Sequence, residues 1–461
     1  MAKRRNGHCG ILQSIRAFCR SEKGSVLPLV GIAFLVIVGV MGMAIDIGRA
    51  QLVESKLLNS IDAAGLAAGA KLNTSTVQAE VEKFVYANYP DGYVDSVVSS
   101  ITTAVTNDGK TITVSATAVM QTAFMQLFGI DEMTIDATSE ITRAIGGLEL
   151  ALVLDNTGSM SGSKLVDLKV AANDLLDIVF GSNSVGDDLF VGVVPFSQSV
   201  NIGTSRAGWI DSAQMNALDW GTTSWGGCVM ARTGGVDRDT TDDPPTTELF
   251  APYYWPDDRN NDWISRGRYR ISRSRSPNKS CSAELTPMTN VKATVSAAID
   301  DMTAEGYTHV NFGTVWGWRM LSPNWRSLWG GSMDTNELPL DYNTPNMNKA
   351  AVIMTDGANT FASSIRGAYG YRSEGRLNGQ TAQGGTVREL NSRLLEVCTN
   401  MKNAGITVYT VAFGSPGNTI ETMMQQCASQ PDFYFDTPTG AELSLAFKMI
   451  GDSLANLRVS K

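Results

Sequence analysis

The stretch LELALVLDNTGSM, residues 148–160, decides the fold of the larger part of the chain. Its first seven residues form a continuous apolar run, which is typical of a strand that is buried on both faces of a parallel sheet. Asp155, Thr157 and Ser159 follow, and an amphipathic helical pattern covers 164–180. This strand–loop–helix order is the first unit of a doubly wound α/β fold. Its polar loop is expected at the carboxyl edge of the sheet, where such folds bind ligands.

The same alternation continues to the carboxyl end, so we expect one α/β domain over 148–461 with a doubly wound, mostly parallel sheet. Residues 203–290 interrupt it because they are polar and turn-rich, and we interpret them as an insertion. Further strands are predicted at 189–196, 349–356, 406–414 and 432–436, and further helices at 291–304, 312–320, 387–405, 418–429 and 440–457.

Two more polar groups are expected at the same edge of the sheet. Thr308 follows a helix stop in AEGYTHV, and Asp356 ends the apolar run AVIMTD. Oxygen atoms on alternate residues can converge on one hard cation, and Mg²⁺ prefers oxygen ligands while keeping several waters. Hydroxyl groups with few carboxylates leave such an ion under-neutralised. We therefore expect it to bind an Asp or Glu carboxylate of a protein partner.

Two other interpretations of this loop remain open. Asp, Thr, Ser and Gly are the residues that any strand-to-helix turn prefers, so the loop could be only a helix cap. Residues 158–162 also fit the GxSxG pattern of a nucleophile elbow, in which Ser161 would attack and His309 would act as the base. Replacing His309 by Gln separates these cases, because a hydrolase would lose activity and a metal-dependent binding protein would not.

Composition excludes several functional classes. The formal net charge is −9, which argues against a generic nucleic-acid-binding protein. Only two histidines exist, His8 and His309, so a multi-histidine metal site is excluded. All nine tryptophans lie within 209–329, where they could form an aromatic partner surface or a small core of the insertion. A basic run at 266–279 is most simply a solvated loop, or else it contacts an anionic surface.

The amino-terminal end predicts a membrane anchor. Residues 1–24 carry a net charge of +5, and the 20 residues from Val26 to Ile45 carry none. A helix of that length spans about 30 Å, the thickness of the hydrocarbon core. Positive charge stays in the cytoplasm, so we expect 1–25 inside and the bulk of the chain outside the inner membrane. The alternative is a signal peptide cleaved after Ala44, which would release a secreted adhesin.

Residues 46–147 are predicted to form an extended helix and a small α+β module. Apolar positions continue at helical spacing to Leu72, and 63–70 is rich in small residues. That stretch either permits close approach of another helix or packs on the following domain. A helix is expected at 77–89 and alternating strands at 96–106, 110–120 and 134–145, the first two joined by a turn at 107–109.

Four cysteines, Cys228, Cys281, Cys398 and Cys427, fall outside the proposed membrane, and an even count in an oxidising space suggests two disulfides. Cys228–Cys281 would close the insertion, and Cys398–Cys427 would join two helices. Three pairings of four cysteines are possible from the sequence alone. A zinc site is not expected, because CxxC spacing is absent.

The chain resembles two known groups of proteins. Residues 23–72 resemble the start of TadG-like proteins of bacterial Flp (tight adherence) pilus systems. DxTxS, GYT and TDG resemble a von Willebrand factor A domain with its metal-ion-dependent adhesion site, and VPFSQSVNIG and TVWGWRMLSP resemble A domains of TadG-like proteins. Thr157 stands where that site usually has serine. Leu29 stands where a pilin cleaved at Gly24 would have glutamate, which favours an uncleaved assembly component.

The resemblance implies a function and a set of site residues. It implies a single-pass protein of the bacterial inner membrane that binds a carboxylate of a pilus or envelope protein, with no catalysis and no nucleic acid. The cofactor would be Mg²⁺ or another divalent cation. Its ligands, direct or through water, would be Asp155, Thr157, Ser159, Thr308 and Asp356.

Overall fold

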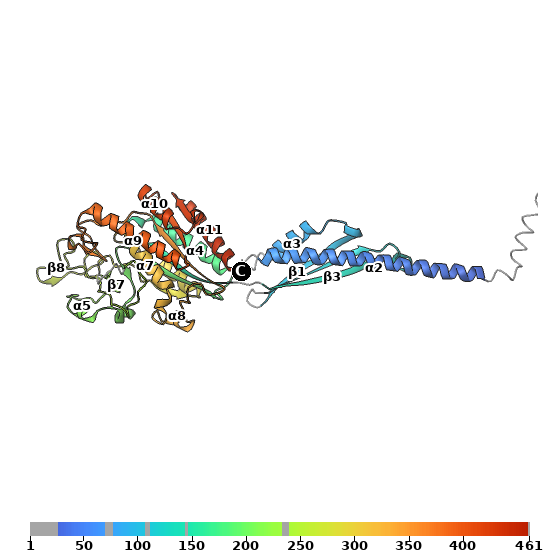
Figure 1. Cartoon of the computed structure of the whole chain (residues 1–461), viewed down its shortest axis with the longest axis horizontal. Helices are drawn as coiled ribbons and strands as arrows, with labels where there is room; N and C mark the ends of the chain where they lie inside the picture. Colours follow the sequence, from blue (N-terminus) through green and yellow to red (C-terminus); the bar gives the residue numbers. More distant parts are fainter. Residues whose placement is uncertain (1–25, 70–76, 107–110, 143–145, 233–238, 460–461) are drawn as a thin grey trace, which may run out of the picture. The chain divides into compact units, whose positions relative to one another are not determined.

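The computed structural model describes residues 26–69, 77–106, 111–142, 146–232 and 239–459, and it divides into two compact units (Figure 1). The first unit holds the described residues up to Thr142, and the second holds those from Gly146. The basic segment 1–25 and the turn expected at 107–109 lie outside the described residues.

One continuous helix, α2 (Val26–Gly69), runs through the first unit. Its side chains are mostly exposed as far as Ile45, and among the described residues α2 is the one helix long and apolar enough to cross a membrane. Beyond Asp46 the helix becomes one-sided: Val53, Leu57 and Ile61 are fully buried, one helical turn apart. The composition of α2 therefore changes along its length while its backbone does not break.

A three-stranded antiparallel sheet packs on the second half of α2. The strands are β1 (Ser96–Thr106), β2 (Thr111–Gln121) and β3 (Glu132–Thr142), in that order, with α3 (Val77–Asn88) beside them. The small residues of α2 serve this packing, since Ala64 and Ala68 are fully buried in the same core and Gly65 lies directly against Ile141. Short 3₁₀ turns, η3 (Tyr93–Asp95) and η4 (Met125–Phe128), complete the module.

The second unit is built on a doubly wound sheet, as the sequence predicts. Its order is β15-β14-β11-β4-β5, all parallel, and β10 pairs with β5 antiparallel. The first strand in sequence lies in the middle, so strand order reverses beside it, and this is where open α/β sheets bind ligands. The strands are β4 (Gly147–Asp155), β5 (Leu189–Phe196), β10 (Thr286–Thr289), β11 (Met347–Thr355), β14 (Thr407–Phe413) and β15 (Tyr434–Thr437).

Helices cover both faces of this sheet (Figure 1). Strand β4 explains why two layers are needed: Leu150 and Leu152 join one core, and Ala151 and Val153 join the other. The first core holds α4 (Ser163–Phe180), α6 (Lys292–Asp300) and α11 (Gly440–Val459). The second holds α7 (Val310–Leu321), α9 (Gln383–Asn403) and α10 (Asn418–Cys427).

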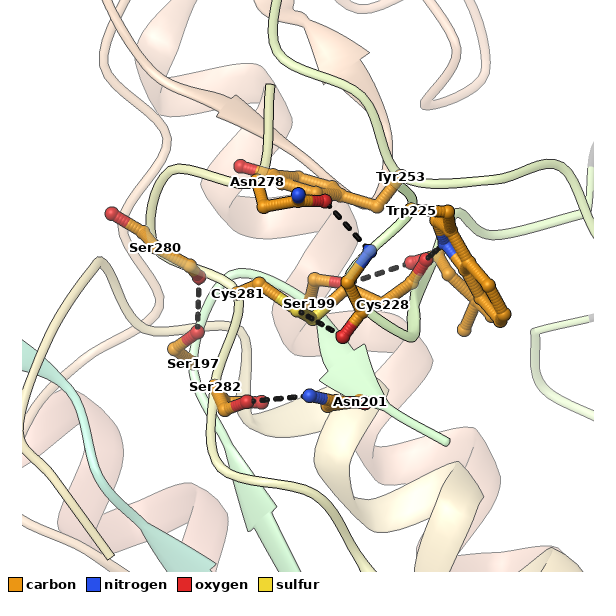
Figure 2. The surroundings of a disulfide bond; sticks show 12 residues. Ser197, Ser199, Asn201, Trp225, Cys228, Tyr253, Asn278, Ser280, Cys281 and Ser282 are labelled. Atoms are coloured by element: carbon orange, nitrogen blue, oxygen red, sulfur yellow. Dashed lines mark hydrogen bonds between the residues drawn. A yellow bond between two sulfur atoms is a disulfide. The ribbon is translucent and has the colours of Figure 1, made fainter. Parts of the chain in front are cut away.

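The segment between β5 and β10 has little regular structure and is closed by a disulfide between Cys228 and Cys281 (Figure 2). Hydrogen bonds surround that bond: the Trp225 indole donates to the Cys228 carbonyl at 2.6 Å, and the Asn201 amide donates to the Ser282 carbonyl at 2.9 Å. A second disulfide joins Cys398 in α9 to Cys427 in α10. The short elements here are β6 (Val200–Asn201), η6 (Thr204–Trp209), α5 (Ser212–Asn216), β7 (Cys228–Val229), β8 (Ile264–Ser265) and β9 (Arg268–Tyr269).

The tryptophans form one of the two arrangements expected of them only in part, and not the other. Eight of the nine are buried, so an exposed aromatic surface is wrong. Trp255 lies in a small separate core of the inserted segment, with Cys228, Met230 and Tyr253. Trp209, Trp316 and Trp325 instead contact one another in the same cluster as β4 and β5. The inserted segment thus folds back on the sheet and extends its core.

Candidate metal centre

Asp155 ends β4 at the carboxyl edge of the sheet, and its side chain is fully buried. The Thr157 amide donates to Asp155 Oδ1 at 2.8 Å, and Thr355 Oγ1 donates to Asp155 Oδ2 at 2.6 Å. The first of these bonds folds the chain back on itself, as Asp side chains commonly do in turns. It brings Thr157 Oγ1 to within 3.0 Å of Ser159 Oγ. One loop thus supplies a carboxylate and two hydroxyl groups side by side.

A second loop, between α6 and α7, carries Thr308 to this group. The helix expected to reach 304 ends at Asp300, and the chain then runs back along the first loop. The Glu305 amide donates to the Asn156 carbonyl at 2.9 Å, and the Gly158 amide donates to the Gly306 carbonyl at 3.0 Å. As a result, Thr308 Oγ1 lies 3.3 Å from Thr157 Oγ1.

A third loop begins where β11 ends and supplies Asp356. Ser159 Oγ donates to Asp356 Oδ1 at 2.6 Å. The other oxygen, Asp356 Oδ2, accepts a hydrogen bond from Lys164 Nζ at 2.7 Å. Because β4 and β11 are parallel neighbours, their carboxyl ends bring Asp155 and Asp356 to the same edge. The five residues singled out in the sequence therefore share one hydrogen-bonded cluster.

The electrostatics of this cluster are set by two neighbouring carboxylates and one lysine. Burial and the nearby Asp356 carboxylate raise the pKa of Asp155 to about 6. Two carboxylates are thus held close together with Lys164 as their cationic neighbour. No group of three or more His, Cys, Asp or Glu side chains that could hold a metal occurs among the described residues. The cluster relies on hydroxyl groups instead, and a set of carboxylate and hydroxyl oxygens fits a hard divalent ion such as Mg²⁺.

A cavity of about 610 Å³ opens beside the cluster. Its walls come from all three loops, through Ser159, Thr308 and Gly357, and from the inserted segment, through Lys279 and Ser280. Gly306 also lines it, with a φ of +81°, and a Cβ there would lie 2.7 Å from Gln198 Oε1, so the close approach of this loop requires glycine. The cavity leaves Ser159 and Thr308 of the cluster accessible from outside.

Ser161 and His309, the residues of the proposed nucleophile elbow, contact other groups in the structure. Ser161 is exposed, and its hydroxyl donates to the Gly158 carbonyl at 2.7 Å. His309 is fully buried against the rings of Phe361 and Tyr369, and this burial lowers its pKa to about 4. The imidazole therefore belongs to the core, and the geometry gives the hydrolase interpretation no support.

Two residues of the cluster were not predicted from the sequence. Thr355 precedes Asp356 in the TDG motif and is the last residue of its strand. Its hydroxyl group could therefore have been expected at the same edge of the sheet. Lys164 had no such indication, because a lysine in the first turn of a helix ordinarily points into solvent.

A comparison with family models matches the amino-terminal part of the chain. Residues 24–71 match the family model described as putative Flp pilus-assembly TadE/G-like. A search of the curated proteins finds no match.

Three solved structures that match this chain are distant from it in sequence. The von Willebrand factor domain of the type V pili tip protein Mfa5 from Porphyromonas gingivalis is 10% identical with a TM-score of 0.35, covering 67% of this chain and 95% of that one. The pilus adhesin SpaC from Lactobacillus rhamnosus GG is 12% identical with a TM-score of 0.36, covering 80% and 35%. Proximal thread matrix protein 1 from the mussel byssus, with a zinc-occupied MIDAS motif, is 12% identical with a TM-score of 0.33, covering 68% and 47%.

The chain thus spans about a third of SpaC and about half of the mussel protein. The second unit itself has a parallel sheet with an antiparallel strand, β10, paired to β5. Residues 24–71 thus match the putative Flp pilus-assembly TadE/G-like family model, and the second unit is an α/β domain with a doubly wound, mostly parallel sheet.

Proposed function

We propose that this chain is a membrane-anchored, extracytoplasmic binding protein of Flp (tight adherence) pilus assembly or adhesion. Its second unit holds a divalent cation, Mg²⁺ by the chemistry of the ligands, and binds an Asp or Glu carboxylate of a pilus or envelope protein. The ion, when bound, supplies an open coordination position for that carboxylate. The ligands are Asp155, Thr157, Ser159, Thr308 and Asp356, directly or through water.

One observation carries the proposal: three loops that are far apart in sequence bring their oxygen atoms into one cluster. Ser159 Oγ lies 2.6 Å from Asp356 Oδ1, although 197 residues separate them. Simple helix capping explains the first loop but not the other two, because a cap needs only the residues next to its own helix. Shared placement at the sheet edge is what a common ligand requires.

Charge around the cavity supports an acidic partner. Lys279 lines the cavity, and Arg273 and Arg275 are exposed in the same segment. Arg273 Nε also lies 3.4 Å from a Glu305 carboxylate oxygen, beside the Thr308 loop. The chain as a whole is acidic, so this local positive charge would steer a partner carboxylate toward the proposed ion.

The proposed anchor is the segment from Val26 to Ile45, with the basic amino-terminal segment in the cytoplasm and the chain from Asp46 onward outside. Support comes from the exposed apolar surface of this part of α2 and from the charge of the preceding residues. The alternative, release after cleavage at Ala44, makes the same binding unit a secreted adhesin. We expect no catalysis in either case, because Ser161 lacks a histidine partner in the described cluster.

Binding to an envelope extract tests the metal centre. The full chain is used as bait in Mg²⁺, in Mg²⁺ with chelator, and as the variants Asp155→Ala and Ser159→Ala. We expect chelator and both variants to abolish capture of the partner. Ser159→Ala guards against misfolding, since it removes one exposed hydroxyl and leaves the buried Asp155 contacts in place.

Ser161→Ala is the matched control, because it removes a hydroxyl two residues away that contacts only the Gly158 carbonyl in the structure. It should capture as much partner as the wild type. Capture that persists in chelator and in Ser159→Ala would refute the metal-dependent mechanism.

A further inference from the structure

The loop between β2 and β3 exposes a group of large apolar side chains. Leu127 is 77% exposed, Phe128 is 60% exposed and Ile130 is 43% exposed. Three such neighbours on one short loop form an apolar patch that a soluble module would not normally present to water. We call residues 122–131 the apolar loop.

The apolar loop packs beside the uncharged part of α2. A Cβ atom added at Gly39 would lie 2.8 Å from the Phe128 ring, and one added at Gly42 would lie 2.6 Å from Phe124. These two glycines therefore allow the aromatic residues to approach the helix backbone closely. Gly39 lies six residues before Ile45, which is about 9 Å along the helix axis at 1.5 Å per residue. The loop thus extends alongside the segment proposed to lie in the membrane.

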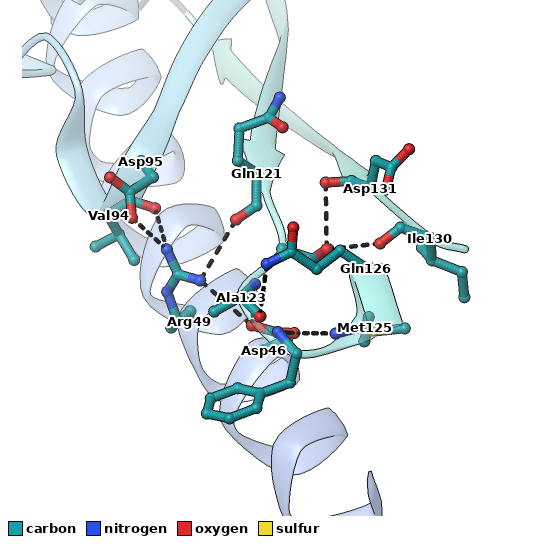
Figure 3. Close-up of polar contacts among 12 residues, drawn as sticks. Asp46, Arg49, Val94, Asp95, Gln121, Ala123, Met125, Gln126, Ile130 and Asp131 are labelled. Atoms are coloured by element: carbon teal, nitrogen blue, oxygen red, sulfur yellow. Dashed lines mark hydrogen bonds and ion pairs between the residues drawn. The ribbon is translucent and has the colours of Figure 1, made fainter. Parts of the chain in front are cut away.

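Asp46 holds the apolar loop at this level (Figure 3). Its fully buried carboxylate accepts hydrogen bonds from the amides of Ala123 at 2.9 Å, and of Phe124 and Met125 at 2.8 Å each. Arg49 lies one turn further along α2 and joins Asp46, at 3.3 Å, to Asp95, at 2.6 Å. These charged groups therefore lie at one level along the axis of α2. The apolar loop lies on the amino-terminal side of this charged level.

The backbone of the apolar loop is suited to an apolar environment, in which unpaired polar groups are costly. The Thr122 hydroxyl donates to the Ile130 carbonyl at 2.6 Å, and the Ile130 amide donates to the Met125 carbonyl at 3.2 Å. The Gly129 amide donates to the Gln126 carbonyl at 3.1 Å, with a φ of +82° that favours glycine. The loop closes on itself and exposes Leu127, Phe128 and Ile130.

We propose that the apolar loop inserts into the leaflet of the membrane from which α2 emerges, with Leu127 and Phe128 among the lipid acyl chains. The inference rests on the proposed anchor at Val26–Ile45. The geometry favours lipid as the occupant. The Phe128 ring packs on Gly39, so if the anchored helix places Gly39 among lipid acyl chains, the ring lies among them too. The charged level formed by Asp46, Arg49 and Asp95 then coincides with the headgroups.

The same contacts bear on the alternative of cleavage after Ala44. Such cleavage would remove Gly39 and Gly42, and with them the helix surface on which Phe128 and Phe124 pack. The released module would carry the whole apolar patch in water. A loop built to lie in the membrane is consistent with an anchor that is retained.

Fluorescence quenching in vesicles tests the insertion. The full chain, with Cys9 and Cys19 replaced by serine, carries one environment-sensitive probe at Leu127→Cys and is reconstituted in phosphatidylcholine–phosphatidylglycerol vesicles. Glu140→Cys is the matched control. Glu140 is exposed on β3, near the end of that strand that is away from the apolar loop. Val36→Cys reports on the anchor itself.

We expect the probe at 127 to be quenched by spin-labelled lipid and shielded from iodide, with a quenching constant for iodide several-fold smaller than that at 140. Two results overturn the loop insertion while the probe at 36 is still in lipid. One is access of iodide to the probe at 127, and the other is shielding of that probe from both quenchers, as a bound protein or a second copy would produce. Iodide access at 36 instead refutes the anchor, and the loop insertion fails with it.

Discussion

Replacing Lys164 by Met should strengthen Mg²⁺ binding at the proposed centre. Lys164 Nζ lies 2.7 Å from Asp356 Oδ2, so an ion that uses Asp356 must either displace this ammonium group or bind beside it. Two unit charges 4 Å apart interact by about 1 kcal/mol in water and about 4 kcal/mol near a protein surface. The lysine side chain is 35% exposed and can swing into solvent, so the low end of this range applies.

We therefore expect a gain of about 1.4 kcal/mol, which is a tenfold lower Kd for Mg²⁺. The assay is isothermal titration of the full chain with Mg²⁺, and a second readout is the rise in melting temperature with added Mg²⁺. Lys169→Met is the matched control on the same helix, because Lys169 Nζ donates to the Asp300 carbonyl at 2.6 Å and not to the cluster. An affinity that is unchanged or weaker in Lys164→Met, with Lys169→Met at the wild-type value, would refute the competition.

Three further perturbations probe the fold of the two units. Lys349→Met should destabilise the second unit by about 3–5 kcal/mol in chemical denaturation, because it leaves the fully buried Glu149 carboxylate without its ion pair. Adding Glu149→Leu should recover most of this loss. A double variant as unstable as the single one would contradict the explanation. Replacing Cys398 and Cys427 by serine should cost about 3.6 kcal/mol by chain entropy for a 29-residue separation, and a loss near zero in the same assay would show that the bond adds no constraint. Gly42→Leu should displace Phe124 and expose the apolar loop to protease in detergent, whereas Gly31→Leu, where the glycine has open space, should leave the digestion pattern unchanged.

The sheet and most of its helices could be predicted because their sequence patterns are local. Strand β4 is a continuous apolar run and is buried along its whole length, as both-face burial requires. The hydrogen-bonded cluster could be predicted in outline for a related reason. Asp155 and Asp356 lie at the ends of neighbouring parallel strands, and parallel strands bring their carboxyl ends together. Thr308 was harder, because it follows no strand and reaches the cluster through backbone bonds between two loops.

Features that depend on distant contacts could not be read from the sequence. The burial of Trp209 and Trp325 in the main core depends on how the inserted segment folds back on the sheet, and no local pattern records that path. The apolar loop was missed because QTAFMQLFGID, residues 121–131, has no strand or helix periodicity and reads as a simple connection. Its meaning depends on Gly39 and Gly42, which are about 80 residues earlier in the chain.

The unbroken course of α2 has a mechanical consequence. The helix is 44 residues long, about 66 Å at 1.5 Å per residue, and its second half is the floor on which the β1-β2-β3 sheet is built. With the first half held in a bilayer, the small module would have no swivel of its own: any tilt of the helix would turn the sheet by the same angle. Tension applied to the module would be transmitted along the helix axis directly to the lipid-embedded segment.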